Sequence, residues 1–511
     1  GAGFSLAQTE ELRGAIAHFR KADKETYFFS DNFGGGSNAT GLYYLAAAFD
    51  EIWMPPMSTL NIFGLHLEQP FISAALEKLD ITAQFFQREA YKGAAEIFER
   101  DSLSPESRAQ LNRLLSDIHQ RMVEAMAAGR EMEPETVQDL IDRAPLTDAE
   151  ARATGLVDQL GTRQQAWKSI KELFPQDSRG VELGDYMKHI VGARRGAMKR
   201  ILDNLRKTAE NPLPELLEDH PLVAMVGVSG PIVSRTEGDF GRQGMADADA
   251  IAKALYEVAG NELYEGVILR IDSPGGSVEA SEKIYQAVQA VKARDIPVIV
   301  SMAGRAASGG YWVAAPADKI IVAPSTLTGS IGVVSGKFAL KDFWARFGVN
   351  WDGLQRGENA EMYSLNQPFD AKAKERINAL MDHTYQAFLR RVAEGRDLSA
   401  EELEALAGGR VWTGAQAVQN GLADHEGGYM RALNEMAQAL EIESYRDFQI
   451  HYLPQPRRSL ARALRALRSE GRMPAYILRR MFAEISGADP ADVQSDFLRV
   501  RAPLWMESAA P

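Results

Sequence analysis

The sequence predicts an α/β protein made from a structural unit that occurs twice in one chain. Short apolar runs rich in β-branched residues, such as 222–228, 266–271 and 296–302, alternate with stretches of helical periodicity. This alternation is typical of a parallel sheet covered by helices. The chain also matches itself at a nearly constant offset, and its 511 residues exceed what one hydrophobic core organises.

The first half opens with a helix over 9–22, where Leu12, Ala15, Ile16 and Phe19 recur at helical spacing. Apolar periodicity and turn residues then predict, in order, a strand at 26–30, a helix at 41–49, a strand at 51–54, a helix at 71–79, a strand at 81–87, long helices to about 127 and a helix at 147–154. In the second half the same criteria predict a strand at 222–228, a helix at 246–258, a strand at 266–271, a helix at 279–293, a strand at 296–302 and a helix at 311–317.

The internal repeat is visible residue by residue. At an offset of 268, Tyr43-Tyr44 falls on Tyr311-Trp312 and Gln87-Arg88 on Gln355-Arg356, and 154–158 matches 420–424 at an offset of 266. Chance spacing of helices and strands does not give so many matches in one register. We therefore predict a tandem duplication of an α/β unit.

The two copies differ at two chemically important positions. Ser308 of the second copy corresponds to Thr40, and Lys92 of the first copy corresponds to Ala360. Ser308 lies between a predicted strand and a predicted helix, among residues with very small side chains. This arrangement presents a hydroxyl and leaves nearby backbone N–H groups free. The same small residues would equally allow a helix to pack closely on a sheet.

Composition narrows the possible functions. The net charge of −13 argues against a nucleic-acid surface, and the absence of cysteine excludes disulfides and thiolate chemistry. No cluster of histidines and carboxylates indicates a metal site, and we expect no cofactor. No apolar run reaches the length of about 18 residues that a membrane span needs. Because the chain starts at Gly1 and carries no signal-peptide pattern, we expect a trimmed piece of a longer protein.

Three motifs, in this order and at these spacings, resemble the signal peptide peptidase A family in its long, duplicated bacterial form. They are Asp272-Ser-Pro-Gly-Gly-Ser-Val278, Ala306-Ala-Ser-Gly-Gly-Tyr-Trp312 and Leu327-Thr-Gly-Ser-Ile-Gly332. The similarity extends from the first residues to about residue 450. It implies a crotonase-like fold related to the Clp protease, and a serine endopeptidase with a serine/lysine dyad.

The resemblance also implies a role for individual residues. Ser308 would be the nucleophile, Lys92 the general base, and Ser330 a hydroxyl that hydrogen-bonds the lysine amine. Gly275 and Gly309 match the positions whose backbone N–H groups form the oxyanion hole of the family. In the long form of the family the serine comes from the C-terminal repeat and the lysine from the N-terminal repeat, which fits the asymmetry between the copies.

A lysine can act as a general base only when it is neutral, so its pKa must fall well below the ordinary value of about 10.4. We therefore expect Lys92 to be enclosed, to contact hydroxyl groups and to have no acidic partner. Glu89 and Glu96 are close to it in the sequence, and an ion pair with either would defeat the mechanism. Glu89 and Ala90 also depart from the small residues usual before the family's tyrosine–lysine pair.

The predicted domain organisation has four parts. Residues 1–192 form the N-terminal repeat, 193–220 a linker, 221–454 the C-terminal repeat, and 455–511 a basic amphipathic extension. The extension suits either an anionic membrane surface or packing on a neighbouring subunit or domain, and we favour the packing.

The resemblance implies partners and a location as well. Substrates would be cleaved signal peptides and other apolar peptides. The protein would be a homo-oligomer, a tetramer enclosing a bowl, attached to the bacterial inner membrane through an N-terminal anchor missing here. Its catalytic part would face the periplasm.

Several alternatives compete with this interpretation. A serine–histidine–aspartate triad would need a histidine, but His383, His425 and His451 lie in no marked motif. The segment 31–36 looks like a phosphate loop but lacks the Walker lysine spacing. A two-repeat crotonase-fold carboxyltransferase acting on acyl-CoA, which needs neither Ser308 nor the lysine, stays open. So does a non-catalytic scaffold that binds membrane peptides.

Overall fold

The computed structural model describes residues 4–34, 37–175, 178, 180–182, 185–186, 220–234, 244–356 and 359–454. The described residues all belong to one compact unit that ends at Pro454. The predicted linker up to residue 219 and the predicted basic extension at 455–511 lie outside the described residues. None of the helices in the described ranges is long and apolar enough to cross a membrane.

The second repeat is organised by an eight-stranded sheet. Its strands are β7 (Leu222–Ser229), β10 (Tyr264–Ser273), β11 (Val298–Ala307), β12 (Lys319–Val322), β13 (Leu327–Gly329), β15 (Val411–Thr413), β16 (His425–Glu426) and β17 (Gln449–Leu453). The main path runs β15-β13-β11-β10-β7-β17, while β12 pairs with β11 and β16. Every pairing in this sheet is parallel except β13 with β15.

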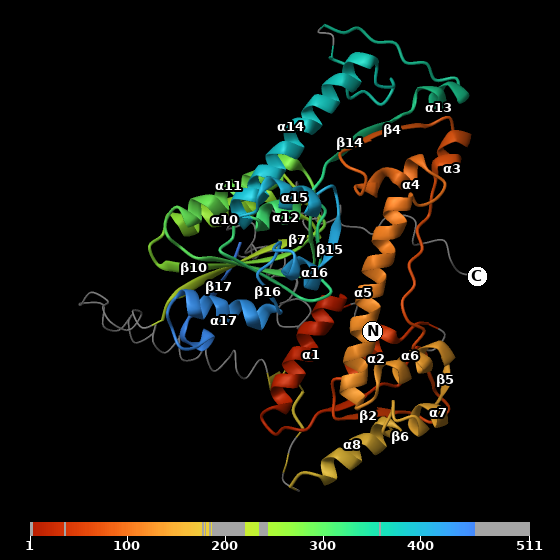
Figure 1. The fold of residues 1–511 in the computed structure, drawn as a ribbon, viewed down its shortest axis with the longest axis vertical. Helices are drawn as coiled ribbons and strands as arrows, with labels where there is room; N and C mark the ends of the chain where they lie inside the picture. The colour runs from red at the N-terminus through yellow and green to blue at the C-terminus, as the bar shows by residue number, and fades with distance from the viewer. Residues whose placement is uncertain are drawn as a thin grey trace, which may run out of the picture. The chain divides into compact units, whose positions relative to one another are not determined.

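Helices cover both faces of this sheet because its strands are apolar on both sides. Side chains such as Val226, Leu269 and Val300 pack with α10 (Ala248–Ala259) and α11 (Val278–Lys292). Side chains of the opposite parity, such as Ile268 and Ile299, pack with α17 (Tyr429–Ala439). Figure 1 shows the central green strands between α10 and α11 on one side and α17 on the other.

The first repeat has a smaller sheet and a separate core. Its parallel strands are β1 (Tyr27–Phe29), β2 (Glu51–Met54) and β6 (Gln159–Leu160), and β3 (Thr59–Leu60) pairs antiparallel with β5 (Leu146–Thr147). Helices α1 (Leu6–Arg20), α2 (Thr40–Ala46), α5 (Pro105–Arg130), α6 (Pro134–Arg143), α7 (Asp148–Ala153) and α8 (Arg163–Glu172) complete it. Buried aromatic and aliphatic side chains such as Tyr43, Phe33 and Met126 fill the core.

Equivalent contacts recur in both repeats, which confirms the predicted α/β tandem duplication. Tyr43 Oη donates to the Leu156 carbonyl and Tyr311 Oη to the Leu422 carbonyl, each at 2.7 Å. Helices α5 and α14 (Ala371–Arg396) each have 26 residues. Both buried phenols therefore satisfy the carbonyl of an equivalent loop, and the two cores share one plan.

The two repeats are joined by a ladder that neither could form alone. Strand β4 (Thr82–Gln87) of the first repeat pairs antiparallel with β14 (Val334–Ala339) of the second over six residue pairs. Figure 1 shows these strands side by side, above the end of α5. Farther along α5, Gln110 Oε1 accepts from the Val411 N–H and Arg113 donates to the Val411 carbonyl. Sequence segments about 300 residues apart thus meet along one seam.

The remaining elements are short. They are α3 (Ser73–Lys78), η1 (Gly93–Ala95), α4 (Glu96–Glu99), β8 (Ile232–Val233), β9 (Ala246–Asp247), α12 (Gly309–Ala314), α13 (Lys341–Arg346), α15 (Ala400–Leu406), α16 (Gly414–Gln419) and η2 (Tyr445–Asp447). The strand predicted at 296–302 extends to Ala307, because the small residues at its end pair with β13. The helix predicted from 311 begins at Gly309, so strand and helix meet at a single residue.

Candidate active site

Ser308 is the single residue between strand β11 and helix α12. Its backbone has φ 55° and ψ −120°, a combination uncommon for residues other than glycine. The Ser308 N–H donates to the Gly329 carbonyl, and its own carbonyl accepts from the Tyr311 and Trp312 N–H groups, each at 2.9 Å. These three bonds fix the strained turn, which stands where a strand passes directly into a helix.

Lys92 comes from the other repeat and meets this hydroxyl. Its Nζ lies 3.1 Å from Ser308 Oγ, 2.9 Å from Ser330 Oγ and 2.9 Å from the Ser330 carbonyl oxygen. Lys92 stands immediately before η1, at a turn whose N–H groups bond to Glu89 and to the segment at Gly408. The structure therefore brings together the three side chains that the sequence singled out, over 216 residues of chain.

The surroundings of the lysine favour its neutral form. Only 6% of Lys92 is exposed, and this burial lowers its pKa from 10.5 to about 8. Among the described residues no carboxylate lies within ion-pair distance of its Nζ. The enclosure expected from the sequence is present.

Glu96, one of the two acidic residues near Lys92 in the sequence, hydrogen-bonds two serines and does not pair with the lysine amine. Its carboxylate accepts from Ser104 Oγ at 2.5 Å, from Ser107 Oγ at 2.9 Å and from the Ser104 N–H at 3.2 Å. The side chain is buried, and these donors lie at the start of α5. Glu96 therefore fastens the lysine-bearing turn to α5 without pairing with the amine.

The backbone donors next to Ser308 differ in one respect from the expectation. Gly275 and Gly309 do lie together, since a Cβ on Gly275 would be 2.6 Å from the Gly309 nitrogen. However, the Gly275 N–H already donates to Ser273 Oγ at 3.1 Å. The N–H groups of Gly276 and Gly309 have no acceptor among the described residues. The sequence motif contains both glycines, but only the backbone geometry distinguishes which N–H is free.

Gly409 is a further contributor that the sequence did not single out. It has φ 79°, and a Cβ there would lie 2.6 Å from the Lys92 nitrogen and 2.8 Å from the Lys92 Cβ. Its N–H donates to the Ile331 carbonyl. A residue from the second repeat thus packs directly against the lysine backbone, which no local sequence pattern indicates.

Other kinds of site find no support in the described part of the chain. Within it, Lys92 is the only side chain that hydrogen-bonds Ser308 Oγ, and His425 and His451 instead contact Glu435 and Tyr264. No group of three or more histidine and acidic side chains in the described ranges could hold a metal ion.

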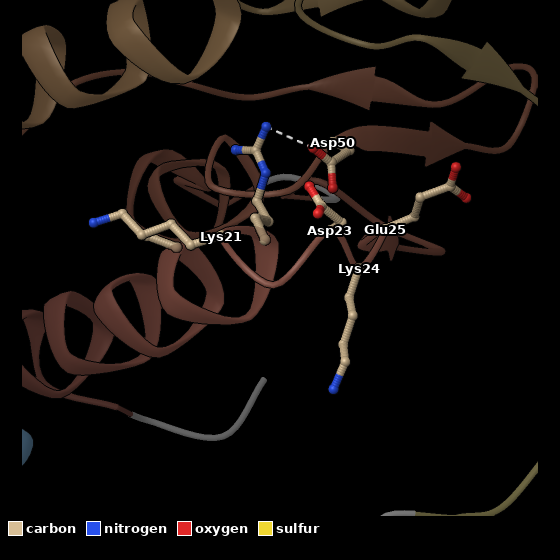
Figure 2. A pocket seen from close by; sticks show the side chains of 7 residues that line it. Lys21, Asp23, Lys24, Glu25 and Asp50 are labelled. Atoms are coloured by element: carbon tan, nitrogen blue, oxygen red, sulfur yellow. Dashed lines mark ion pairs between the residues drawn. The ribbon is translucent and has the colours of Figure 1, made fainter.

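A surface pocket lies at the end of α1 and contains none of the site residues. It is lined by Ala17, Arg20, Lys21, Asp23, Lys24, Glu25 and Asp50. Figure 2 shows these side chains with the Arg20–Asp50 ion pair between them. Charges of both signs spread over an open surface, and they supply no nucleophile with a matching base.

Comparison with known proteins finds a peptidase family and several proteases that are similar to most of the chain. The model of Peptidase family S49 matches residues 32–176 and 290–443, and the model named Clp protease matches 242–327. "Protease 4" of Haemophilus influenzae is 31% identical over 480 residues, covering 90% of this chain and 73% of that protein. "Protease 4" of Salmonella typhi is 27% identical, covering 84% and 66%. "Serine protease SPPA, chloroplastic" of Arabidopsis thaliana is 29% identical, covering 89% and 64%.

Two solved structures were also matched over part of the chain. A ClpP1 mutant from Listeria monocytogenes has 17% sequence identity and a TM-score of 0.27, covering 41% of this chain and 93% of its own. A mutant of the 1510-N membrane-bound stomatin-specific protease has 18% identity and a TM-score of 0.29, covering 46% and 99%.

The fold and the relatives together define the class of protein. It is a serine protease built from two Clp-protease-like units. The family model covers more than half of the chain, and the Haemophilus relative is matched over most of its length. The chain belongs to Peptidase family S49. It spans about two thirds to three quarters of the length of these three relatives.

Proposed function

We propose that the protein is a serine endopeptidase in which Ser308 is the nucleophile and Lys92 the general base. The observation that carries this proposal is the 3.1 Å contact between Lys92 Nζ and Ser308 Oγ in an enclosure without a carboxylate. A serine hydroxyl is a weak nucleophile and needs a base that removes its proton during attack. A lysine with a pKa of about 8 supplies such a base near neutral pH.

The reaction has two halves. Neutral Lys92 takes the Ser308 proton as Oγ attacks the carbonyl carbon of the scissile peptide bond. When the tetrahedral intermediate collapses, the ammonium gives its proton to the leaving amine, and an acyl-enzyme ester forms. Water then attacks the ester, with Lys92 again accepting and returning a proton, and Ser308 is regenerated. Ser330 orients the amine through its hydroxyl and carbonyl oxygens.

The oxyanion needs two fixed donors. We retain Gly309 as the first and propose the N–H of Gly276 as the second, in place of Gly275, whose N–H is engaged by Ser273. The role of Gly275 is then steric: its φ of 100° and its contact with Gly309 leave no room for a side chain. Loss of one donor in such a site costs about 100- to 1000-fold in rate.

The substrates that we propose are cleaved signal peptides and similar apolar peptides. A relative from Enterococcus faecium is named "Putative signal peptide peptidase SppA" and is 28% identical over 239 residues. We further propose that the protein works as a homo-oligomer, a tetramer, at the bacterial inner membrane with its catalytic part on the periplasmic side. Sedimentation of the purified protein and fractionation of cells test these two points.

Covalent labelling tests the mechanism. A fluorophosphonate should label the wild-type protein, and the variants Ser308→Ala and Lys92→Ala should be unlabelled and should not cleave an apolar peptide. If the wild type is unlabelled, or if either variant cleaves normally, the dyad proposal fails. Binding of acyl-CoA by the unlabelled protein would then favour a carboxyltransferase, and peptide binding without cleavage a scaffold.

A further inference from the structure

Two arginines stand beside the proposed dyad, and the reaction described above uses neither. Arg113 belongs to α5 of the first repeat, and Arg410 precedes β15 of the second. Both side chains are partly exposed. The charge of Arg410 acts on Arg113, whose pKa is lowered first by burial and then by this second guanidinium. We refer to Arg113 and Arg410 as the arginine pair.

The arginine pair is held in place by aromatic rings. The Arg410 guanidinium carbon lies 3.9 Å from the ring centre of Tyr91, and that of Arg113 lies 4.2 Å from the ring centre of Trp412. Stacking on a ring face fixes the plane of a guanidinium and leaves its N–H edge available for an acceptor. Such pre-orientation reduces the entropy lost when a ligand binds.

Neither arginine of the pair forms an ion pair in the described part of the chain, where no carboxylate lies within 4.0 Å of either guanidinium. The carboxylate whose charge acts on Arg113 is that of Asp117, one turn along α5. Arg113 donates to the Val411 carbonyl at 2.8 Å, but its Nε is fully buried and has no hydrogen-bond partner. Buried donors without acceptors are rare in proteins, so the protein itself does not use the full hydrogen-bonding capacity of the Arg113 guanidinium. A fully structural role would account for the Val411 contact and leave this donor unexplained.

The position of the pair connects it to the site. The Arg410 carbonyl accepts from the Ser330 N–H at 2.6 Å, and the Ser330 side chain contacts the Lys92 amine. Tyr91, on which Arg410 stacks, directly precedes Lys92 in the chain. Arg410 is therefore connected to Lys92 through Tyr91 and to Ser330 through its own carbonyl, and Arg113 is joined to the same segment through Val411.

We propose that the arginine pair binds a carboxylate of the peptide substrate and so selects peptides that carry one near the cleaved bond. A guanidinium offers paired N–H donors that match the two oxygens of a carboxylate. The carboxylate is either the free α-carboxylate of a peptide, as any peptide released by an earlier cleavage carries, or an aspartate or glutamate side chain. This inference rests on the proposed peptidase function.

Binding is measured in the Ser308→Ala protein, so that catalysis does not enter. The probes are a fluorescent apolar peptide whose only carboxylate is at its C-terminus, the same peptide with a C-terminal amide, and amides carrying a single glutamate or glutamine at successive positions. We expect the amide to bind at least tenfold more weakly than the free acid by fluorescence anisotropy. If instead one glutamate-containing amide matches the free acid while its glutamine counterpart does not, the carboxylate source is a side chain.

The variants Arg410→Gln and Arg113→Gln should bind the free-acid peptide and its C-terminal amide with nearly equal affinity. Arg410→Lys should restore part of the preference for the free acid. The matched control is Arg294→Gln, an exposed arginine after α11, which should keep the wild-type preference. Equal affinities for all peptides, or a preference that survives both glutamine variants, would overturn the proposal. Thermal unfolding of each variant excludes misfolding as the cause.

The outcome separates this inference from the proposed function. Cleavage of peptides with no preference for a carboxylate rejects the arginine pair as a binding site and leaves the peptidase intact. Selective binding of the free acid by Ser308→Ala, together with a wild-type protein that is neither labelled nor active, rejects the peptidase and leaves a carboxylate-binding site.

Discussion

At the scale of single residues, the pKa of Lys92 sets the pH dependence of the proposed reaction. The base must be neutral, so kcat/KM should rise with pH and level off above a pKa of about 8. The rate of fluorophosphonate labelling should follow the same curve, since it depends on the same proton transfer. A labelling rate that is constant between pH 6 and pH 9 would contradict a lysine base.

The same burial makes a prediction about stability. In the unfolded chain Lys92 has its ordinary pKa of 10.5, and in the folded protein about 8, so below pH 8 the fold must enclose an ammonium group. Lys92→Met, which has no charge, should therefore be more stable than the wild type below pH 8. The difference should shrink between pH 8 and 10.5, where the unfolded state binds the extra proton. Chemical unfolding at pH 7 and pH 9.5 measures it.

At the scale of elements, the turn that carries Lys92 depends on its attachment to α5. Glu96→Ala would leave Ser104 and Ser107 without their acceptor in a buried place, at a cost of about 1–3 kcal/mol. Glu96→Gln keeps one acceptor oxygen and should cost less. We expect labelling of Ser308 to fall in the same order, Glu96→Ala below Glu96→Gln below wild type. Activity that is unaffected while stability drops would show that the attachment does not position the lysine.

The packing of the segment before β15 against the turn that carries Lys92 can be tested with two glycines of similar conformation. Gly409 has φ 79° and touches Lys92, whereas Gly348 has φ 71° and has no atom near the place of a Cβ. Each change to alanine pays the left-handed backbone cost of about 1–2 kcal/mol. Only Gly409→Ala should also displace Lys92 and abolish labelling. Equal activity of the two variants would mean that the Gly409 contact is dispensable.

Part of the candidate active site could be predicted from the sequence. The missing lysine in one copy and the missing serine in the other, together with the family resemblance, predicted that Ser308, Lys92 and Ser330 meet. The proposed exchange of Gly275 for Gly276 as an oxyanion donor was not predictable from the sequence, because it depends on the hydrogen bond that the Gly275 N–H gives to Ser273 Oγ. The arginine pair, likewise, comes from segments about 300 residues apart, and their proximity exists only across the seam.

At the scale of the whole molecule, the two repeats should stay together without the covalent link between them. The β4–β14 ladder joins six residue pairs, and the contacts of Arg88 with Asn378 and Asp382 lie beside it. A protease cleavage sequence inserted between residues 193 and 219 would allow the chain to be cut. We expect the cut protein to elute as one species and to keep its labelling by fluorophosphonate.

The control for this experiment is the inserted protein before cutting, which should behave as the wild type. Separation into two inactive fragments under native conditions would contradict the prediction and show that the link is needed to hold the seam. Recovery of activity on mixing the separated fragments would then show that the seam can re-form.

The contact between Ser308 and Lys92 also has a consequence for how the protein is made. Ribosomes add about 5–20 residues per second, so the 216 residues between these side chains take roughly 10–40 seconds to synthesise. During that interval the nascent chain contains the proposed base but not the proposed nucleophile, so it cannot cut neighbouring proteins by this mechanism. Activity can begin only after the second repeat has folded against the first. Splitting the proposed dyad between two copies thus delays proteolysis until the second repeat has been synthesised.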